Sequence, residues 1–310
     1  MVKKFDVVVF GSGVVDVFAS SDVGEKKGKL DLDVGSKYLI GNLKSDIGGG
    51  GTNVAVAFSR FGFKTGCVCG VGKDSNGKEI LDCLKREGIG FLGRIGDGRS
   101  GYSFILDSRK NNRTIFTYKG ESNEVSFGDI KRFKSDWIYF SSLLGKSFVA
   151  QKRLAREMVG NGSKLILNPS SYSIRKQDLK GLLKLSSVLI LNKEEARSLL
   201  RKYRGDRKQV MGDRNLLGGL CKLGPGIVVV TDKDKATVCF DGEKLYRVFP
   251  NKKKKVVERT GAGDAFGAGF VGGLIAGMGI RESLKLGIEE SEAVLGYFGA
   301  KNNLLKRKIK

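Results

Sequence analysis

Short apolar runs that recur along the whole chain, with amphipathic stretches between several of them, place the strongest limit on its fold. Runs of this length and composition are typical of strands rather than of buried helices. Strands that are apolar throughout are buried on both faces, and they form parallel sheets covered by helices. The sequence therefore predicts an α/β fold with a mainly parallel central sheet and helices on both of its faces. The runs are Phe5–Phe10, Gly66–Gly70, Trp137–Phe140, Lys164–Leu167, Val188–Leu191 and Ile227–Val230.

Two segments interrupt this pattern, at about residues 16–47 and 98–120. The second alternates polar positions with Tyr102, Phe104 and Leu106, and alternation indicates half-buried strands. We expect both segments to supply strands outside the central sheet. The chain has 310 residues, which is long for one simple domain, but α/β enzymes of this size are commonly one domain with an appendage. We predict a single α/β domain over residues 1–310.

A polar loop near the C-terminus becomes a helix of small residues, with one carboxylate at the junction. Gly261, Ala262 and Gly263 carry almost no side chain, so their N–H groups can approach an anion at the helix N-terminus. Asp264 follows directly, and the natural role of a carboxylate beside a phosphate site is to accept a proton from a hydroxyl that attacks the phosphoryl group. The alternative is a capped helix with a solvated Asp in its first turn.

Three motifs carry a resemblance to a known family. The segment Gly261-Ala262-Gly263-Asp264-Ala265-Phe266, with Gly269, looks like the C-terminal signature of the ribokinase-like (PfkB) family of carbohydrate and nucleoside kinases. Residues 48–62 resemble its N-terminal signature, and Asn192-Lys193-Glu194-Glu195 is similar to its Asn-x-x-Glu motif. The resemblance implies a ribokinase-like fold with a small β-sheet lid over the sugar site, built from the two interrupting segments. It also implies phosphotransfer from ATP to a hydroxyl of a small sugar or a nucleoside.

The phosphoryl acceptor has its own candidate residues. Asp16 follows the first apolar run, at the carboxyl end of a strand, where open α/β sheets bind ligands. The Asn53 amide can both donate to and accept from hydroxyls. In the resembled family the residue matching Asp16 binds the substrate. The alternatives are that Asp16 caps the strand and that Asn53 caps a helix. A turn without side chains would let the backbone approach the sugar closely, and it consists of Gly48, Gly49, Gly50 and Gly51.

Asn192 and Glu195 follow another apolar run and are the candidates for a magnesium site. Mg²⁺ keeps most of its waters, so a carboxylate and an amide can hold it through that water shell while it bridges nucleotide phosphates. By the family's spacing, Glu195 is the motif residue and Glu194 is not. The alternative is a helix capped by Asn192 with acidic residues in its first turn.

The expected nucleotide contacts are Thr231, Lys233 and Asn302. Thr231 opens a stretch where the resembled family commonly has a Thr-x-Gly-x-x-Gly turn, although Lys233 and Ala236 replace its glycines. A solvated turn is the alternative interpretation of Lys233. We expect the adenine pocket between this turn and the last helix, near Asn302.

Departures from the family pattern bear on the acceptor and on activation. Ribokinases proper have a Lys at the position of Gly50 and a Glu where this chain has Ser141 and Ser142, so ribose is not assured as the acceptor. Phe18, Tyr102 and Tyr118 line the lid pocket or pack the lid. Before the anion hole, Glu258 and Arg259 replace the family's usual Asp-Thr pair, which argues against activation by a monovalent cation.

The formal charge of +23 supports a rival hypothesis, because lysine-rich surfaces bind nucleic acid by releasing counterions. The lysines are scattered, however, and no nucleic-acid-binding motif accompanies them. A noncatalytic nucleotide sensor is the other alternative.

The chain contains no His, and its five cysteines lack the spacing of a disulfide framework or zinc site. No signal peptide or membrane-spanning run is evident, so we expect a cytoplasmic protein. Family relatives often dimerise through the lid, and a homodimer of that kind is expected from the resemblance alone.

Overall fold

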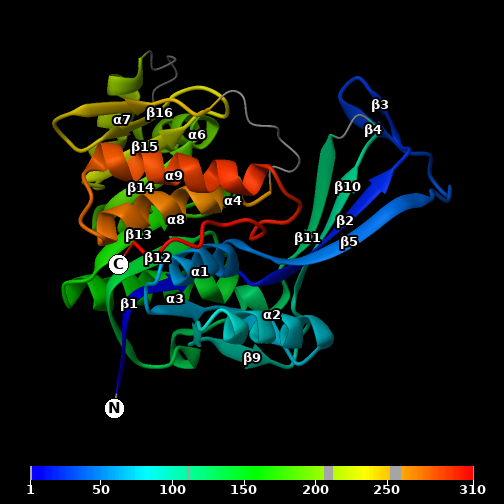
Figure 1. Ribbon diagram of the computed structural model, residues 1–310, viewed down its shortest axis with the longest axis horizontal. Coiled ribbons are helices and arrows are strands. Elements are labelled where there is room, and N and C mark those ends of the chain that lie inside the picture. The colour runs from blue at the N-terminus through cyan, green and yellow to red at the C-terminus, as the bar shows by residue number, and fades with distance from the viewer. Residues whose placement is uncertain (1, 110–111, 206–211, 252–259, 310) are drawn as a thin grey trace.

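The central sheet of the computed structural model confirms the predicted α/β architecture (Figure 1). The model describes residues 2–109, 112–205, 212–251 and 260–309. Within them the sheet has nine strands, and each predicted apolar run supplies one of them. The strands are β1 (Lys3–Phe10), β6 (Thr65–Val68), β8 (Gly90–Phe91), β12 (Phe133–Ser141), β13 (Lys164–Asn168), β14 (Ser186–Asn192), β15 (Ile227–Thr231), β16 (Thr237–Phe240) and β17 (Leu245–Val248).

The order of these strands places a ligand site next to β1. The order is β17-β16-β15-β14-β13-β12-β1-β6-β8, and every pair from β15 to β8 is parallel, whereas β15, β16 and β17 pair antiparallel. The chain leaves β1 to build β6 on one side and later returns to build β12 on the other. In open α/β sheets, ligands bind outside the carboxyl ends of the strands at such a reversal. Here those ends are Phe10 and Ser141.

Helices cover both faces of the sheet, as predicted. Alternate residues of β1 point to opposite faces, so Val7 and Val9 belong to one apolar core while Val8 and Phe10 belong to the other. The first core is closed by α1 (Gly50–Arg60), α2 (Ser75–Arg86), α8 (Ala262–Ile275) and α9 (Ile280–Leu295). The second is closed by α3 (Gly145–Gly160), α4 (Ser171–Lys176), α5 (Lys180–Leu185), α6 (Lys193–Arg204) and α7 (Asp213–Cys221).

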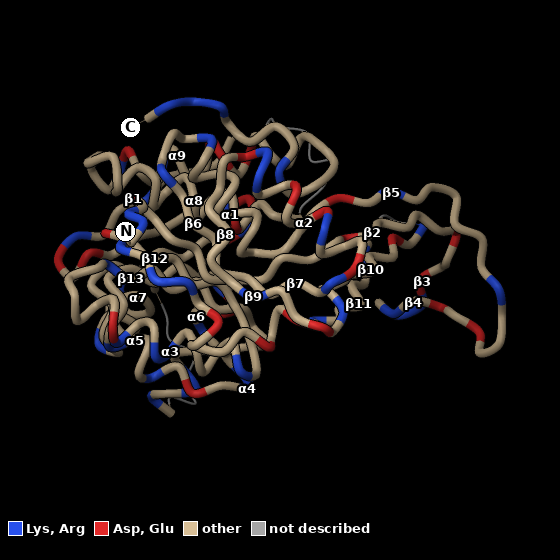
Figure 2. The backbone as a smooth tube through the Cα atoms, turned by 90° about the horizontal axis from the view of Figure 1, so that it is seen from below, with Lys and Arg blue, Asp and Glu red and all other residues tan. Residues whose placement is uncertain are grey.

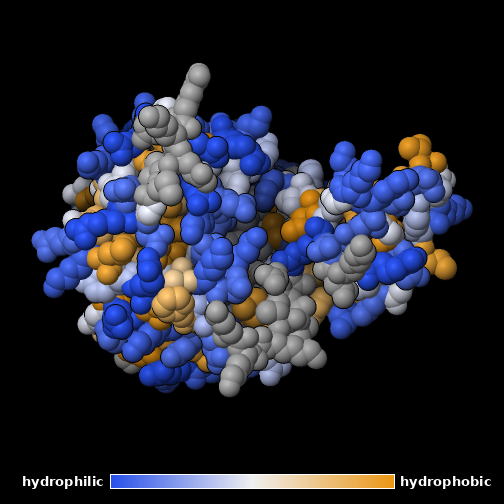
Figure 3. All heavy atoms as spheres, turned by 90° about the horizontal axis from the view of Figure 1, so that it is seen from above, coloured by the Kyte–Doolittle hydropathy of each residue, from blue (hydrophilic) through white to orange (hydrophobic). Residues whose placement is uncertain are grey.

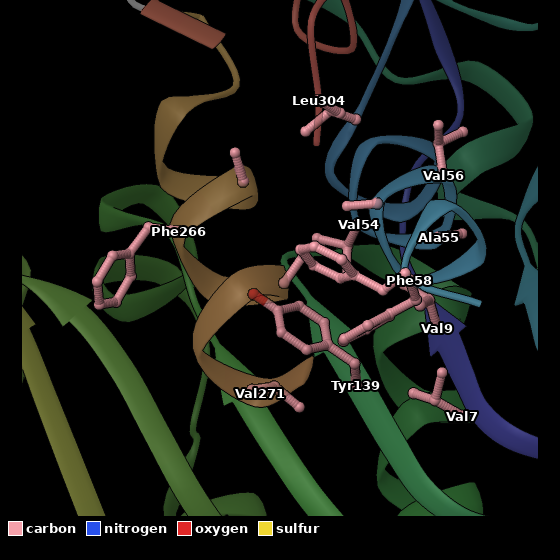
Figure 4. Packing of buried hydrophobic residues seen from close by; sticks show 14 of the residues in the cluster. Val7, Val9, Val54, Ala55, Val56, Phe58, Tyr139, Phe266, Val271 and Leu304 are labelled. Carbon is pink, nitrogen blue, oxygen red and sulfur yellow. The ribbon is translucent and has the colours of Figure 1, made fainter. Parts of the chain in front are cut away.

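Close packing fixes α8 above the sheet. Figure 4 shows Tyr139 of β12 directed toward α8, beside Phe58 of α1. The Tyr139 hydroxyl lies against Gly267, where a Cβ would collide with it, and Gly269 meets α9 at Gly287 in the same way. The small residues of α8 therefore let the helix lie close to the sheet and to α9. This close packing fixes the position of the N-terminal end of α8 relative to the sheet.

A second, four-stranded sheet extends away from the main body (Figure 1). It consists of β2 (Val14–Ser21), β5 (Ile40–Gly48), β10 (Gly101–Asp107) and β11 (Arg113–Tyr118), in the order β11-β10-β2-β5. These strands come from the two segments that interrupt the sequence pattern. The action of this sheet as a lid stays a prediction.

Directly paired residues of neighbouring strands share one face, and this rule sorts the side chains of the small sheet. One row contains Ser103, Asp16 and Asp46, and the next contains Phe18. Tyr102 and Tyr118 lie on the opposite face. Apolar residues are exposed on this part of the molecule (Figure 3), and those in or next to the strands of the small sheet include Leu39, Leu43, Ile115 and Phe116. A homodimer through this sheet stays a prediction.

Short elements complete the described chain: β3 (Gly24–Lys26) with β4 (Lys29–Asp31), β7 (Gly70–Gly72) with β9 (Arg94–Gly96), and the 3₁₀ helices η1 (Gly120–Asn123) and η2 (Phe127–Asp129). Across the described residues, no helix combines the length and apolar character needed to cross a membrane. All five cysteines are free, and four of them are buried.

Candidate active site

The N-terminal end of α8 is the centre of the candidate site. Gly261 caps the helix with a φ of +80°, a left-handed conformation that favours glycine. A Cβ at Gly261 would also collide with Ala300. The helix begins at Ala262, so the N–H groups of its first turn have no carbonyl partner within the helix. This end can stabilise an anion, and the anion-hole role of Gly261, Ala262 and Gly263 stays a prediction.

Asp264 lies in the first turn of α8 and is half-buried. Its Oδ2 accepts a hydrogen bond of 2.8 Å from Nδ2 of Asn53. Its Oδ1 faces the glycine turn, 3.3 Å from where a Cβ on Gly50 would stand. Burial raises the pKa of Asp264, while the Asn53 hydrogen bond and the charge of Lys301 act in the opposite direction. One carboxylate oxygen is thus engaged, and the other is directed at the turn proposed for the acceptor.

The glycine turn joins β5 to α1. Gly49 has a φ of +93°, and a Cβ there would collide with the Ser12 carbonyl, which accepts the Gly51 N–H at 2.9 Å. The helix is capped by Gly49 without a side-chain bond. Asn53 therefore lies inside the first turn of α1 and does not cap it, because its side chain bonds to Asp264.

Asp16 lies within β2 and is buried, so it does not cap a strand. Burial raises its pKa, and a hydrogen bond with Ser103 and the charges of Lys301 and Lys119 lower it. A Cβ on Gly48 would collide with the Asp16 carboxylate. Gly48 therefore leaves space for that carboxylate beside the turn.

Nothing in the sequence singles out Lys301 among its many lysines, yet its ammonium lies in the middle of this site. Lys301 is 5% exposed, and its Nζ donates hydrogen bonds to the Ile47 carbonyl and, at 3.0 Å, to Oδ1 of Asn53. Burial lowers its pKa, whereas Asp46, Cys83, Asp16 and Asp264 raise it.

Two further residues lie in the site, and no motif in the sequence marked them as site residues. Oδ2 of Asp46 is buried and has no hydrogen-bond partner among the described residues. Arg113 of β11 donates a hydrogen bond of 2.7 Å to the Thr260 hydroxyl, directly before the Gly261 cap. The small sheet therefore reaches the N-terminal end of α8.

Asn192 and Glu195 form a capping box at the start of α6, which is the alternative considered from sequence. Oδ1 of Asn192 accepts the Glu195 N–H at 2.9 Å, and Oε2 of Glu195 accepts the Asn192 N–H at 2.9 Å. Oε1 of Glu195 accepts from the Ser171 N–H at 3.0 Å. Burial raises the pKa of Glu195, and these hydrogen bonds lower it.

The donor set at α6 can be tested against a magnesium ion. A carboxylate oxygen has two lone pairs, so Oε2 of Glu195, which accepts one hydrogen bond, can still accept from water. Oε1 already accepts from both the N–H and the hydroxyl of Ser171. Among the described residues no group of three or more carboxylate, thiol or imidazole side chains could ligate a metal directly. The residues fit a hydrated Mg²⁺ held through its waters, and they do not form a closed cage.

The candidate nucleotide contacts lie at the end of β15, in the turn that follows it, and in the segment after α9. Thr231 ends β15 directly opposite Asn192 of β14, so the two lie side by side at the carboxyl edge of the sheet. Lys233 has a φ of +51°, so the backbone keeps a glycine-like conformation although Lys replaces the family's glycine. Asn302 lies in the segment after α9, with its Nδ2 donating to the Phe298 carbonyl and lying beside Gly299.

A pocket of about 510 Å³ lies beside the Thr231 turn. Its wall includes the ion pair between Lys193 and Asp232, at 2.7 Å. The other lining residues are Asp213, Val230, Asp234, Lys235, Ala236, Val238, Arg247 and Phe249.

Comparisons with known proteins identify the family. The model of the pfkB family carbohydrate kinases matches residues 6–307. The chain belongs to the pfkB family. An uncharacterized sugar kinase of Archaeoglobus fulgidus is 29% identical over 261 residues, which cover 80% of this chain and 98% of that protein. An ATP-dependent 6-phosphofructokinase of Thermoanaerobacterium thermosaccharolyticum is 26% identical over 96% of this chain and 90% of its own length.

A solved kinase structure has the same fold as this chain. Adenosine kinase from Sinorhizobium meliloti superimposes with a TM-score of 0.81 at 20% identity, covering 96% of this chain and 95% of that one. The ribokinase-like fold predicted from sequence is therefore confirmed. This pfkB-family protein is a kinase.

Gly50 and Ser141, two positions at which this pfkB-family kinase differs from ribokinases, lie against each other. A Cβ on Gly50 would stand 2.9 Å from Oγ of Ser141, a hydroxyl that is buried and has no hydrogen-bond partner among the described residues. A Lys at one position and a Glu at the other would thus be neighbours, and this chain has replaced both with small residues. Glu258 and Arg259, on which the argument against a monovalent cation rests, lie outside the described residues.

Proposed function

We propose that this kinase transfers the γ-phosphoryl group of ATP to a hydroxyl of a small sugar, with Asp264 as general base. One observation supports this above all. The Asp264 carboxylate stands at the N-terminal end of α8 with Oδ2 held by Asn53 and Oδ1 directed at the glycine turn. A base directed at the acceptor, beside a helix end that stabilises anions, is the arrangement that phosphotransfer requires.

The acceptor hydroxyl would lie between Oδ1 of Asp264 and the γ-phosphate. Asp16 would accept hydrogen bonds from the acceptor, and Asn53 would contact it at the turn of Gly48, Gly49, Gly50 and Gly51. As the acceptor oxygen bonds to phosphorus, its proton moves to Oδ1 of Asp264, and the bond from phosphorus to the bridging oxygen breaks, leaving ADP.

The donor end would hold ATP against Thr231, Lys233 and Asn302. Charge that develops on the transferred group would be stabilised by the N–H groups of Gly261, Ala262 and Gly263. Glu195 and Asn192 would hold Mg²⁺ through its water shell, and the bound ion would neutralise charge on the phosphates.

A nucleoside is the second candidate acceptor, and one observation favours it. Phe18, on the site face of the small sheet, packs edge to face against Phe298 with ring centroids 4.5 Å apart. Phe18 is buried, and the half-buried ring of Phe298 that it supports would give a base a surface on which to lie.

Nucleic-acid binding has less support from the structure. Figure 2 shows Lys and Arg on both sheets and on the helices of both layers, interleaved with acidic residues. Several lysines lie in ion pairs, as Lys193 does with Asp232. The charge is thus spread over the molecule, which suits a solvated surface that attracts anionic nucleotides.

The test is ADP release from MgATP across ribose, fructose, ketodeoxygluconate, phosphorylated sugars and nucleosides, with Asp264→Asn as the control. Turnover on one sugar class, lost in the control, supports the proposal; turnover on nucleosides alone selects the second candidate. ATP binding without turnover on any acceptor would favour a noncatalytic sensor. Salt-steep binding to DNA or RNA without kinase activity would favour the nucleic-acid alternative.

A further inference from the structure

Lys301 is a buried cation that the proposed mechanism does not use. It lies in the short segment after α9, and its side chain points inward between the glycine turn and the small sheet. Burying an ammonium is costly unless it is paired and hydrogen-bonded. The hydrogen bonds of Lys301 and the surrounding carboxylates offset that cost, and the bond to Asn53 links it directly to the candidate base.

Lys301 and Asp264 together orient the Asn53 amide, each holding one end of it. An ammonium has only donors, so the Asn53 atom that faces it at 3.0 Å is the amide oxygen. The amide nitrogen then points the other way and donates to Oδ2 of Asp264 at 2.8 Å. With an apolar side chain in place of Lys301, the amide oxygen would lose its charged donor, and the Asp264 carboxylate alone would hold the amide in this orientation. The flipped amide would turn its oxygen toward the carboxylate, which repels it.

This orientation of Asn53 fixes which oxygen of Asp264 is available. Oδ2 is engaged by Asn53, so Oδ1 is the oxygen that faces Gly50. We propose that Lys301 is a positioning residue for phosphotransfer, which directs the Asp264 base at the acceptor through the side-chain amide of Asn53. This role rests on the proposed function of Asp264.

Helix α1 holds Lys301 at two points, which makes its position rigid. Asn53 bonds to the Lys301 ammonium, and Arg60 donates from Nη1 to the Lys301 carbonyl at 2.8 Å. Asn53 and Arg60 are two helical turns apart and share one face of α1. Arg60 is itself held by two hydrogen bonds to the Glu87 carboxylate. The backbone of Lys301 is thus tied to α1, and its ammonium is buried beside Asn53.

The charge of Lys301 also acts on Asp264. The titratable groups that face Lys301 besides Asp264 are Asp16 on β2, Asp46 on β5 and Cys83 on α2. Tyr139 on β12 faces Asp264. Burial raises the pKa of both Cys83 and Tyr139, so these two are neutral near neutral pH. Lys301 is thus the cation that lowers the pKa of Asp264, while Lys119 faces Asp16. Loss of Lys301 should raise the pKa of Asp264 further.

The experiment compares Lys301→Met with Lys202→Met. Lys202 donates to the carbonyls of Ile174 and Gln177, away from the site, so this control removes a lysine that caps backbone carbonyls without touching Asn53. We expect Lys301→Met to lower kcat by about 10²-fold, because the base is misdirected, with little change in the KM for ATP. The acid limb of its pH–rate profile should move to higher pH. Lys202→Met should match the parent protein both in kcat and in the position of the acid limb.

Two more variants separate positioning from mere packing. Lys301→Gln keeps a neutral donor near Asn53, so it should regain part of kcat without restoring the acid limb. In Asn53→Ala, a further Lys301→Met should lower kcat much less than it does alone, because both act through one amide. A folded Lys301→Met protein with parental kcat, or full additivity with Asn53→Ala, would overturn the proposal.

A titration that needs no turnover keeps this result separate from the kinase proposal. The ¹³C carboxyl signal of Asp264, assigned by its loss in Asp264→Asn, should titrate at higher pH in Lys301→Met than in the parent. An unchanged midpoint overturns the link between Lys301 and Asp264. If no acceptor is phosphorylated by the parent protein, the proposed function fails, and this titration still decides whether Lys301 controls Asp264.

Discussion

The two ends of the candidate site are built in different ways. At the acceptor end, Asn53 bonds to both Asp264 and Lys301, which come from segments far from it in the sequence. At the donor end, Asn192 and Glu195 bond to each other's backbone within one helical turn, and Lys233 is exposed. The acceptor end is thus held by tertiary contacts alone, whereas the donor end combines a local capping box with a tertiary hydrogen bond from Ser171 to Glu195.

This difference decides what the structure can say about function. A buried polar network is costly to form, so its members are constrained to one arrangement, and the arrangement itself points to a function. A capping box stabilises a helix whether or not it binds a metal, so its geometry is explained without any ligand. The role of Asp264 therefore has support from geometry, while the role of Glu195 rests on the family pattern and on the chemistry of its oxygens.

The largest effect should come from the acceptor end. Asp264→Asn keeps the shape of the side chain but removes its ability to take a proton, so kcat should fall by about 10²–10⁴-fold. The affinity for ATP should change little, since the amide still fits the first turn of α8. Steady-state kinetics with the best acceptor would measure kcat, and calorimetric titration would measure the affinity for ATP. Near-parental kcat would show that Asp264 is not the base.

Stability should also depend on pH at the acceptor end, through Glu290 of α9. This carboxyl group has no exposed surface, and its Oε2 accepts the Leu305 N–H at 2.9 Å, which holds the segment that follows Lys301. Burial raises the pKa of Glu290 to about 7, against an ordinary value of 4.5, although the Leu305 bond and Arg60 lower it. The native state therefore binds a proton that the unfolded chain releases.

The direction of the pH dependence of stability follows from this difference between the native and unfolded pKa of Glu290. The stabilisation by Glu290 is complete below about pH 4.5 and is lost as the pH rises through about 7, and it amounts to about 3 kcal/mol. Glu290→Gln should remove this dependence. Urea unfolding of parent and variant at about pH 5 and about pH 8 would measure it. Equal pH dependence of the two proteins would contradict the assignment.

The sequence predicted the parts of the site that depend on local patterns. Apolar runs indicate strands because burial on both faces leaves no room for polar alternation, and small residues beside Asp264 indicate a helix end open to an anion. Family motifs added the glycine turn and Asn192 with Glu195. These features need only neighbouring residues to be recognised, and the fold they imply is confirmed by the central sheet.

Residues that act through tertiary contacts could not be found in this way. Lys301 is one of 56 Lys and Arg residues, and only the fold brings it beside Asn53. Asp46 is recognised only once β2 and β5 pair, because their register places it next to Asp16. The same pairing rule puts Tyr102 and Tyr118 on the face away from Asp16, which the sequence left open.

The smallest effect, and the one that sharpens the contrast between the two ends, should come from Glu195→Gln. Glutamine also completes a capping box, so the start of α6 and the stability of the protein should be preserved. The variant loses the charge that would attract a hydrated Mg²⁺, so the Mg²⁺ concentration for half-maximal rate should rise by about 10-fold. Asn192→Ala is the matched control. It removes the side chain that caps α6, so unlike Glu195→Gln it should also destabilise the start of this helix. A parental Mg²⁺ requirement in Glu195→Gln would mean that Glu195 serves only the helix, and that the donor end binds its metal through other groups.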